Sequence, residues 1–231
     1  MTRSTRLGLA GAAGSGKDTF GDYLRIAFEA EGKNVLVTSF AQPIRLICHD
    51  LGLDPYTRDT KETVVKKRYS FFAGKLIDAI NRHLGDYAGE EDLANLFAYF
   101  TTALTDGGYL RTSLADFLEI SPRRFCQLLG TEGGRSVRKS FWNDVLIARC
   151  KRLDYHQKLD FVIVTDVRFP DEALPVDDII TIKREGIAAV SAHESESHYD
   201  FLEQESAWII ENNGSLADLE QDAKDLAEEY K

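Results

Sequence analysis

The chain has 231 residues, 43% of them hydrophobic and 29% charged, and its formal net charge is −10 at pH 7. This composition is typical of a globular protein, and the length suffices for one large core or for one domain with an insertion. The acidic balance excludes a broad basic surface for duplex nucleic acid, although it leaves room for a local basic pocket.

Cysteine usage and hydropathy indicate the cellular compartment. The three cysteines, Cys48, Cys126 and Cys150, are an odd number without close pairing, so they predict reduced, mostly buried thiols rather than disulfides or a zinc site. No apolar run reaches the length of a transmembrane helix, and the basic start MTRSTR is followed by no signal-peptide core. We therefore expect a cytoplasmic protein that binds neither membranes nor nucleic acid.

Apolar runs and amphipathic segments alternate along the chain. Short apolar runs predict five strands, at residues 6–11, 34–40, 161–167, 177–184 and 206–212. Apolar residues with helical spacing extend from Lys17 to Glu31, after the first strand, and from about Ser215 to Tyr230, after the last. Strands that alternate with helices predict a three-layer α/β fold, in which helices cover both faces of a five-stranded parallel sheet.

A long segment of helical composition, about residues 41–157, separates the second and third predicted strands. We interpret it as an insertion over the strand ends rather than as a separate domain. Residues 1–231 then form a single domain, whose core consists of about residues 1–40 and 158–231. A loop-rich stretch between the fourth and fifth strands, around HESESH, predicts a lid at about residues 185–205.

Three shorter stretches within the insertion carry structural expectations of their own. Ser121-Pro122 is typical of a helix start, and we expect GTEGG (130–134) to break that helix. Residues 58–69, RDTKETVVKKRY, predict mainly a solvated helix face. Residues 108–117 predict a loop. Trp142 is expected to pack in the core, with stacking on a base as the alternative.

The stretch GAAGSGKDT, residues 11–19, fits the spacing G-x-x-x-x-G-K between a buried strand and an amphipathic helix. Backbone N–H groups can surround a phosphate only where side chains do not intrude, which explains the glycines. The helix N-terminus favours an anion, and Lys17 supplies a mobile positive charge. A plain flexible turn is the alternative, but the strand before and the helix after favour a nucleotide-phosphate loop. Asp18 stands where many such loops place Ser or Thr, so whether Thr19 contacts a metal is open.

A second group of candidates lies at the end of the third predicted strand. Asp166 ends this buried strand, where a carboxylate would lie beside the phosphate loop and could orient the water shell of Mg²⁺. Arg168 follows at the exit of the strand, and Pro170 begins a short helix. A strand-terminal Asp that caps the next turn is the alternative interpretation.

A third group is a basic cluster within an otherwise acidic chain, made of Arg123, Arg124, Arg135, Arg138 and Lys139. Guanidinium groups suit a second phosphate, and Gln127 on the same predicted helix could read a base edge. Arg45, after the second strand, is a further candidate for a substrate phosphate. A solvated basic face that pairs with nearby acids is the alternative.

These stretches together resemble the deoxynucleoside monophosphate kinases of bacteriophages. GAAGSGKDT, FAQPIR, QLLGTEGGR with the later FW, TDVRFPDEA, HESE and IIENNGSLADL occur in the expected order over nearly the whole chain. The first and last are shared with other P-loop kinases, whereas QLLGTEGGR and DVRFPDEA are more specific. The resemblance implies a P-loop fold like that of adenylate kinase, ATP as donor, a deoxynucleoside monophosphate as acceptor and a possible homodimer. Residues 71–118 match nothing in it.

With this resemblance, the candidates take roles in transfer of the γ-phosphoryl group of Mg-ATP to a (deoxy)nucleoside monophosphate. The donor would be held by the phosphate loop and by the residue directly before the predicted lid. These residues are Gly11, Gly14, Ser15, Gly16, Lys17, Asp18, Thr19 and Arg184. The acceptor and the transferring group would be held by Arg45, Gln127, Arg135, Arg138, Asp166 and Arg168. Lys17, Arg168 and Arg135 are the expected catalytic residues, and Asp166, with Thr19 as the second candidate, would serve the metal.

Two alternatives stay open. One is another small-molecule P-loop kinase, such as a dephospho-coenzyme A kinase, and the other is a nucleotide-binding switch without enzymatic activity. The basic cluster with Gln127 favours a nucleotide acceptor over both, because a switch needs no second phosphate pocket. The bases accepted, and the choice between ribose and deoxyribose, cannot be read from these residues.

Overall fold

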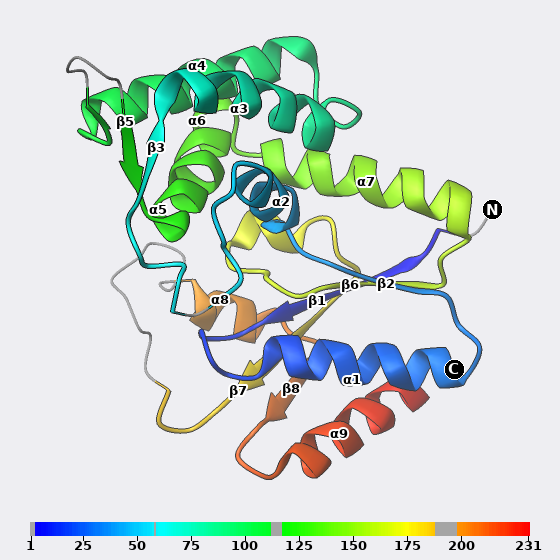
Figure 1. Cartoon of the computed structure of the whole chain (residues 1–231). Helices are drawn as coiled ribbons and strands as arrows, with labels where there is room; N and C mark the ends of the chain where they lie inside the picture. Colours follow the sequence, from blue (N-terminus) through cyan, green and yellow to red (C-terminus); the bar gives the residue numbers. More distant parts are fainter. Residues whose placement is uncertain (1–2, 58, 112–116, 188–197) are drawn as a thin grey trace. The chain divides into compact units, whose positions relative to one another are not determined.

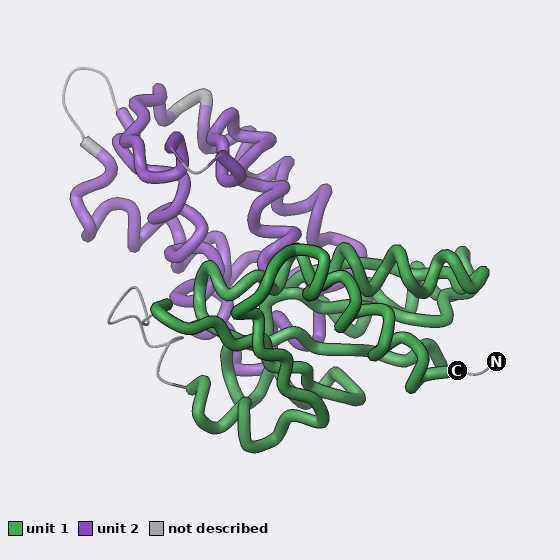
Figure 2. Tube along the Cα trace, turned by 90° about the horizontal axis from the view of Figure 1, so that it is seen from below, with its two compact units in different colours: residues 1–40, 146–231 green, residues 41–145 purple. Residues whose placement is uncertain are grey.

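The computed structural model describes residues 3–57, 59–111, 117–187 and 198–231. The chain forms two compact units (Figure 2): unit 1 comprises residues 1–40 and 146–231, and unit 2 comprises residues 41–145. Residues 188–197, about half of the predicted lid, lie outside the described residues. None of the helices described has both the length and the hydropathy needed to cross a membrane.

Unit 1 contains the parallel sheet and the helices around it. Its elements are β1 (Thr5–Ala10), α1 (Lys17–Ala30), β2 (Val35–Thr38), β6 (Phe161–Val164), the 3₁₀ helix η2 (Pro170–Ala173), β7 (Asp178–Lys183), α8 (Tyr199–Gln204), β8 (Trp208–Glu211) and α9 (Leu216–Glu229). The strand order is β2-β6-β1-β7-β8, and every neighbouring pair is parallel. The predicted α/β class, with five parallel strands, is therefore confirmed.

Helices lie on both faces of this sheet (Figure 1). On one face, α1 and α9 bury an apolar layer with β1, β6 and β7, in which Phe28 stacks on Phe161 with ring centroids 3.9 Å apart. On the other face lies the part of α7 (Phe141–Gln157) that begins at Leu146, and Val162 and Val164 are fully buried beneath this layer. A sheet covered on both sides explains why its strands read as continuous apolar runs.

Unit 2 is mainly helical and has its own core. Its elements are α2 (Gln42–Asp50), β3 (Val65–Arg68), α3 (Tyr69–Leu84), α4 (Glu90–Asp106), β4 (Leu110–Arg111), β5 (Phe117–Ile120), α5 (Pro122–Gln127), the π-helix η1 (Leu128–Gly134) and α6 (Arg135–Val137). Phe125 lies at the centre of this core, in edge contact with Phe100 and Phe72. Of the cysteines, Cys48 in unit 2 and Cys150 in unit 1 are buried, as predicted, whereas Cys126 in unit 2 is partly exposed.

The structure corrects two expectations for unit 2. Residues 65–68 form a strand of a small antiparallel sheet, in the order β3-β5-β4, rather than a solvated helix face. Three of the four residues of β3 are cations, so the usual alternation of apolar residues that marks a strand is missing. The expected loop at 108–117 also contributes to this sheet, through Leu110 and Arg111 in β4 and Phe117 in β5. Residues 112–116 lie outside the described part.

The second correction concerns GTEGG, which does not break the helix after Ser121. The chain continues from α5 into the wider turns of η1 and then into α6. The glycines allow close packing: a Cβ on Gly134 would collide with the indole of Trp142, whose Nε1 donates to the Gly130 carbonyl at 2.8 Å. Trp142 is only 8% exposed, which confirms its place in the core.

Candidate functional site

The loop between β1 and α1 folds as the sequence predicts for a phosphate loop. Gly11 and Gly16 have φ angles of +134° and +100°, which residues with a side chain rarely adopt. A Cβ on Gly11 would also collide with the Ile182 carbonyl of β7. Both glycines are therefore required by backbone conformation and by the close approach of neighbouring groups.

Several donors of this loop are left without acceptors. The backbone N–H groups of Gly16, Asp18 and Thr19 meet no acceptor among the described residues, and the first helical bond joins Phe20 N–H to the Gly16 carbonyl. Unsatisfied N–H groups at a helix N-terminus form an anion site. Lys17 lies along the same loop, where its Nζ donates to the carbonyls of Gly11 and Ala12, each at 2.7 Å.

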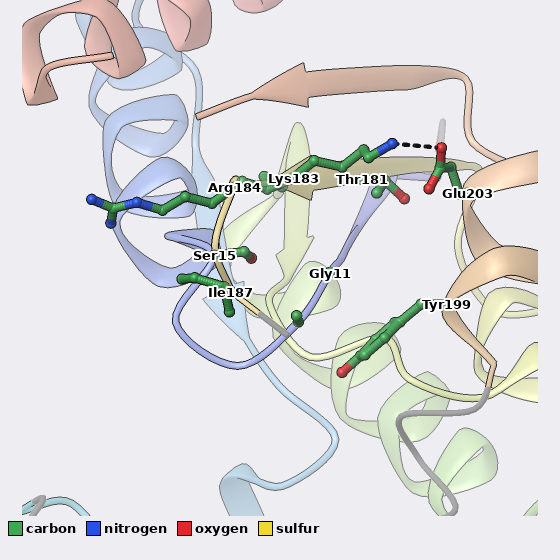
Figure 3. A pocket seen from close by; sticks show the side chains of 10 residues that line it. Gly11, Ser15, Thr181, Lys183, Arg184, Ile187, Tyr199 and Glu203 are labelled. Carbon is green, nitrogen blue, oxygen red and sulfur yellow. Dashed lines mark hydrogen bonds and ion pairs between the residues drawn. The ribbon is translucent and has the colours of Figure 1, made fainter. Parts of the chain in front are cut away.

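A pocket of about 160 Å³ adjoins this loop (Figure 3). It is lined by Gly11, Ala12, Ser15, Thr181, Ile182, Lys183, Arg184, Ile187, Tyr199 and Glu203. On one side of the pocket, Lys183 forms an ion pair with Glu203 at 2.9 Å. Ile187 and the phosphate loop lie on the other side (Figure 3). The exposed side chain of Arg184 extends away from Glu203. The bond to Glu203 raises the pKa of Lys183. Ser15 is 1% exposed, and its Oγ has no hydrogen-bond partner in the described structure.

Asp166 and Arg168 follow β6, at the end of the sheet where the loop lies. Asp166 is 6% exposed, and its Oδ1 accepts the Phe40 backbone N–H at 2.7 Å, so the carboxylate also joins the ends of β6 and β2. The Arg168 side chain makes no hydrogen bond or ion pair with the part of the chain that the structure describes. Its backbone is fixed by Glu172, whose Oε2 accepts the N–H groups of Arg168 at 2.8 Å and Phe169 at 3.1 Å.

Two buried polar residues in unit 1 were not anticipated from the sequence. Glu172 was visible only as part of the short helix after Pro170, where an acid in the first turn is common. Asn212 follows β8, is 8% exposed, and donates from Nδ2 to the Ser15 carbonyl at 2.8 Å. The pattern NNGS signals a turn, but nothing local to it shows a contact with a loop 197 residues away.

The other predicted residues, Arg45, Gln127, Arg135 and Arg138, belong to unit 2. Arg45 lies on α2, which packs against α5, the helix that ends at Gln127. The hydrogen bond with the Cys48 thiol lowers the pKa of Cys126, and the charge of Arg45 adds to this lowering. Arg45 therefore lies near Cys126, the neighbour of Gln127 in the chain.

Most of the basic cluster is engaged in ion pairs within unit 2. Arg123 pairs with Glu62 at 2.7 Å, and Arg124 pairs with Glu132 and bonds the Tyr109 hydroxyl at 2.8 Å. Arg138 pairs with Asp92 and with Asp144. For these three arginines, the ion pairs agree with the alternative interpretation of the cluster as a basic face that pairs with nearby acids. Arg135, on α6, is partly exposed and directly follows η1.

Comparison with family models identifies the family of the chain. The model described as "Deoxynucleotide monophosphate kinase" matches residues 108–223. The chain belongs to this family. The matched residues include Gln127, Arg135, Asp166 and Arg168. The phosphate loop lies outside the matched range, so its geometry is an observation independent of the family match.

Curated proteins provide no match to the chain. Among solved structures, a dephospho-CoA kinase from Campylobacter jejuni is 13% identical, with a TM-score of 0.42 and coverage of 97% of this chain and 96% of that one. A cobyrinic acid a,c-diamide synthase from Mycobacterium smegmatis, with bound ADP and magnesium, is 16% identical, with a TM-score of 0.39 and coverage of 99% and 83%. These TM-scores mark a loose likeness only.

Proposed function

We propose that the protein transfers the γ-phosphoryl group of Mg-ATP to a (deoxy)nucleoside monophosphate. An oxygen of the acceptor phosphate forms a bond to the γ-phosphorus, the bond from that phosphorus to the β–γ bridging oxygen breaks, and ADP and a nucleoside diphosphate leave. The observation that carries the proposal is the loop from Gly11 to Thr19, with its unsatisfied N–H groups and Lys17. The family of the chain, deoxynucleotide monophosphate kinases, agrees with it.

The donor triphosphate would occupy the loop. The N–H groups of Gly16, Asp18 and Thr19 would receive phosphate oxygens, and Lys17 would exchange its two carbonyl partners for the β- and γ-phosphates. Gly11 and Gly14 would keep the loop open, Ser15 would offer its unpartnered hydroxyl, and Arg184 would approach ATP from the end of β7.

Magnesium bound with ATP supplies positive charge that neutralises the phosphate oxygens. The residues present fit such an ion. Asp166, with Oδ1 engaged by Phe40, would act through a bound water, and the Thr19 hydroxyl is the second candidate.

The residues that we assign to the acceptor are Arg168 of unit 1 and, in unit 2, Arg45, Gln127, Arg135 and Arg138. Phosphoryl transfer requires in-line positioning and cations around the transferring group rather than covalent help from the protein. We assign these cationic roles to Arg168 and Arg135, and secondary roles to Arg45 and Arg138. Arg138 would have to exchange its ion pairs with Asp92 and Asp144 for phosphate. Gln127 would read the base. The substrate-binding insertion, about residues 41–157, is part of this proposal.

The proposal extends to the setting of the reaction. Three uncrosslinked cysteines suit a reducing compartment, so we place the protein in the cytoplasm, which would be that of the host if the chain comes from a phage. We also propose that the protein forms a homodimer and that about residues 185–205 act as a lid.

A coupled assay of ADP formation tests this function. ATP is mixed with each common ribo- and deoxyribonucleoside monophosphate, with dephospho-coenzyme A, and with no acceptor. We expect ADP formation that depends on one or more monophosphates. Activity with dephospho-coenzyme A alone would replace the proposal by its rival kinase, and ADP binding without dependence on any acceptor would indicate a nucleotide switch.

A further inference from the structure

Asn212 is held between two parts of the nucleotide site. Its backbone N–H donates to the Lys183 carbonyl at the end of β7, at 2.7 Å. Its side-chain Nδ2 donates to the Ser15 carbonyl of the phosphate loop, at 2.8 Å. The residue is 8% exposed, so this amide contact is shielded from water and the Asn212 side chain has a fixed direction.

The bond to Ser15 fixes the orientation of one peptide group. In a trans peptide, the C=O of one residue and the N–H of the next point in opposite directions. Because Asn212 holds the Ser15 carbonyl on its own side, the N–H of Gly16 points away from Asn212. This N–H is one of the loop donors without an acceptor in the described structure.

Gly16 and Asn212 also fit one another sterically. Gly16 has φ +100°, and a Cβ at this position would collide with Nδ2 of Asn212. The amide therefore occupies the space that a side chain on Gly16 would fill. An asparagine that only closed the turn after β8 would not need to contact the loop, since its neighbour Asn213 already bonds the Glu185 backbone N–H at 2.8 Å.

We infer that Asn212 is a positioning residue of the phosphate loop, which orients the Ser15–Gly16 peptide so that the Gly16 N–H is presented to the polyphosphate of the nucleotide. The inference rests on the proposed function, because it requires that the loop binds phosphates. Asn212 acts through Gly16 and touches no reacting atom. Alanine at position 212 would leave the Ser15 carbonyl without its partner, and aspartate would place an acceptor against it.

The test compares Asn212→Ala and Asn212→Asp with wild type and with the matched control Asn213→Ala, whose side chain bonds the adjoining backbone but not the loop. ADP and inorganic pyrophosphate are titrated by calorimetry below all melting transitions, and KM is measured for ATP and for the best monophosphate. We expect both Asn212 variants to bind ADP and pyrophosphate about 10-fold more weakly, as for one lost contact to a charged group. KM for ATP should rise by a similar factor, KM for the monophosphate should stay unchanged, and the control should bind as wild type.

The outcomes separate the inference from the function on which it rests. ADP and pyrophosphate affinities of the Asn212 variants within twofold of wild type, whatever their melting temperature, would overturn the inference and leave the function intact. No binding by wild type would overturn both. If the variants do not fold, the Gly16 amide signal of ¹⁵N-labelled wild type decides: it should move downfield with pyrophosphate because this N–H gains an acceptor, and an unmoved signal at saturation would refute the inference.

Discussion

Glu172 accepts the backbone N–H of Arg168 at 2.8 Å and holds this arginine at the exit of β6. The same carboxylate oxygen accepts the N–H of Phe169, and Glu172 is 8% exposed. Glu172→Ala should therefore lower the free energy of unfolding by about 1–3 kcal/mol, because two N–H groups lose their charged acceptor. It should also lower kcat, because the arginine would no longer be fixed.

Melting curves and steady-state kinetics check this prediction. Glu172→Gln keeps an acceptor oxygen and should lie between wild type and the alanine variant. Leu174→Ala is the matched control, since Leu174 is 81% exposed in the same segment and should change neither quantity. An alanine variant at Glu172 with wild-type stability and kcat would contradict this role.

Lys17→Ala should abolish phosphoryl transfer without unfolding the protein. Lys17 is the cation of the loop, and its Nζ donates to the carbonyls of Gly11 and Ala12. Loss of a charged contact to the transition state costs about 100-fold or more in rate. Lys224→Ala, on the exposed face of α9, serves as the control for loss of a lysine charge. Turnover near that of wild type in the Lys17 variant would exclude the phosphate-loop assignment.

Arg135→Ala should weaken use of the monophosphate far more than binding of ATP, because we assign Arg135 to the acceptor. Arg135→Lys should restore only part of the activity, since an ammonium group cannot form the bidentate contact of a guanidinium. Separate KM values for the two substrates measure this. Loss of ATP affinity with an unchanged KM for the monophosphate would place the GTEGGR segment on the donor side instead.

Gln127→Leu should change the ratio of kcat/KM among monophosphates while ATP binding stays intact. A lost bidentate contact to a base edge is worth about 1–3 kcal/mol, or roughly 5- to 150-fold for the preferred base. Kinetics on four monophosphates, with a melting curve, measure the effect. A lowered melting temperature with an unchanged substrate ratio would show that Gln127 is a structural residue.

Gly134→Ala should destabilise the protein, whereas Gly74→Ala should stabilise it. A Cβ at Gly134 would collide with Trp142, and such overpacking costs about 1–3 kcal/mol. Gly74 is exposed within α3 with nothing near its missing Cβ, so alanine there should gain about 0.5–1 kcal/mol. Thermal unfolding of the two variants gives the comparison, and equal stability for both would contradict the packing described for η1.

The parallel sheet and the phosphate loop could be predicted from the sequence because their signals are local. The five strands are apolar runs that end at turn residues, and Gly11, Gly14, Gly16 and Lys17 are close together in the chain. The strand β3 could not be predicted in this way, since its sequence VKKR lacks apolar alternation and it is defined by its partner β5. Likewise, the glycines of η1 read as helix breakers, whereas their true role depends on Trp142.

The same distinction applies to the candidate site. Lys17 and Asp166 could be proposed as candidates from their positions after strands, whereas the bonds made by Glu172 and Asn212 could not be predicted. Glu172 and Asn212 act through backbone groups, and the bond from Asn212 to Ser15 joins residues 197 positions apart. No local pattern specifies such a contact. The assignment of Arg45, Gln127 and Arg135 to an acceptor stays a prediction.

Transfer of label from [γ-³²P]ATP tests the central claim most directly. The protein is incubated with labelled ATP and with each deoxynucleoside monophosphate, and the products are separated by chromatography. We predict that the label appears in the nucleoside diphosphate, in an amount equal to the ADP formed, and that Lys17→Ala eliminates it. Label that appears only as inorganic phosphate, or that stays in ATP with every monophosphate tested, would contradict the claim.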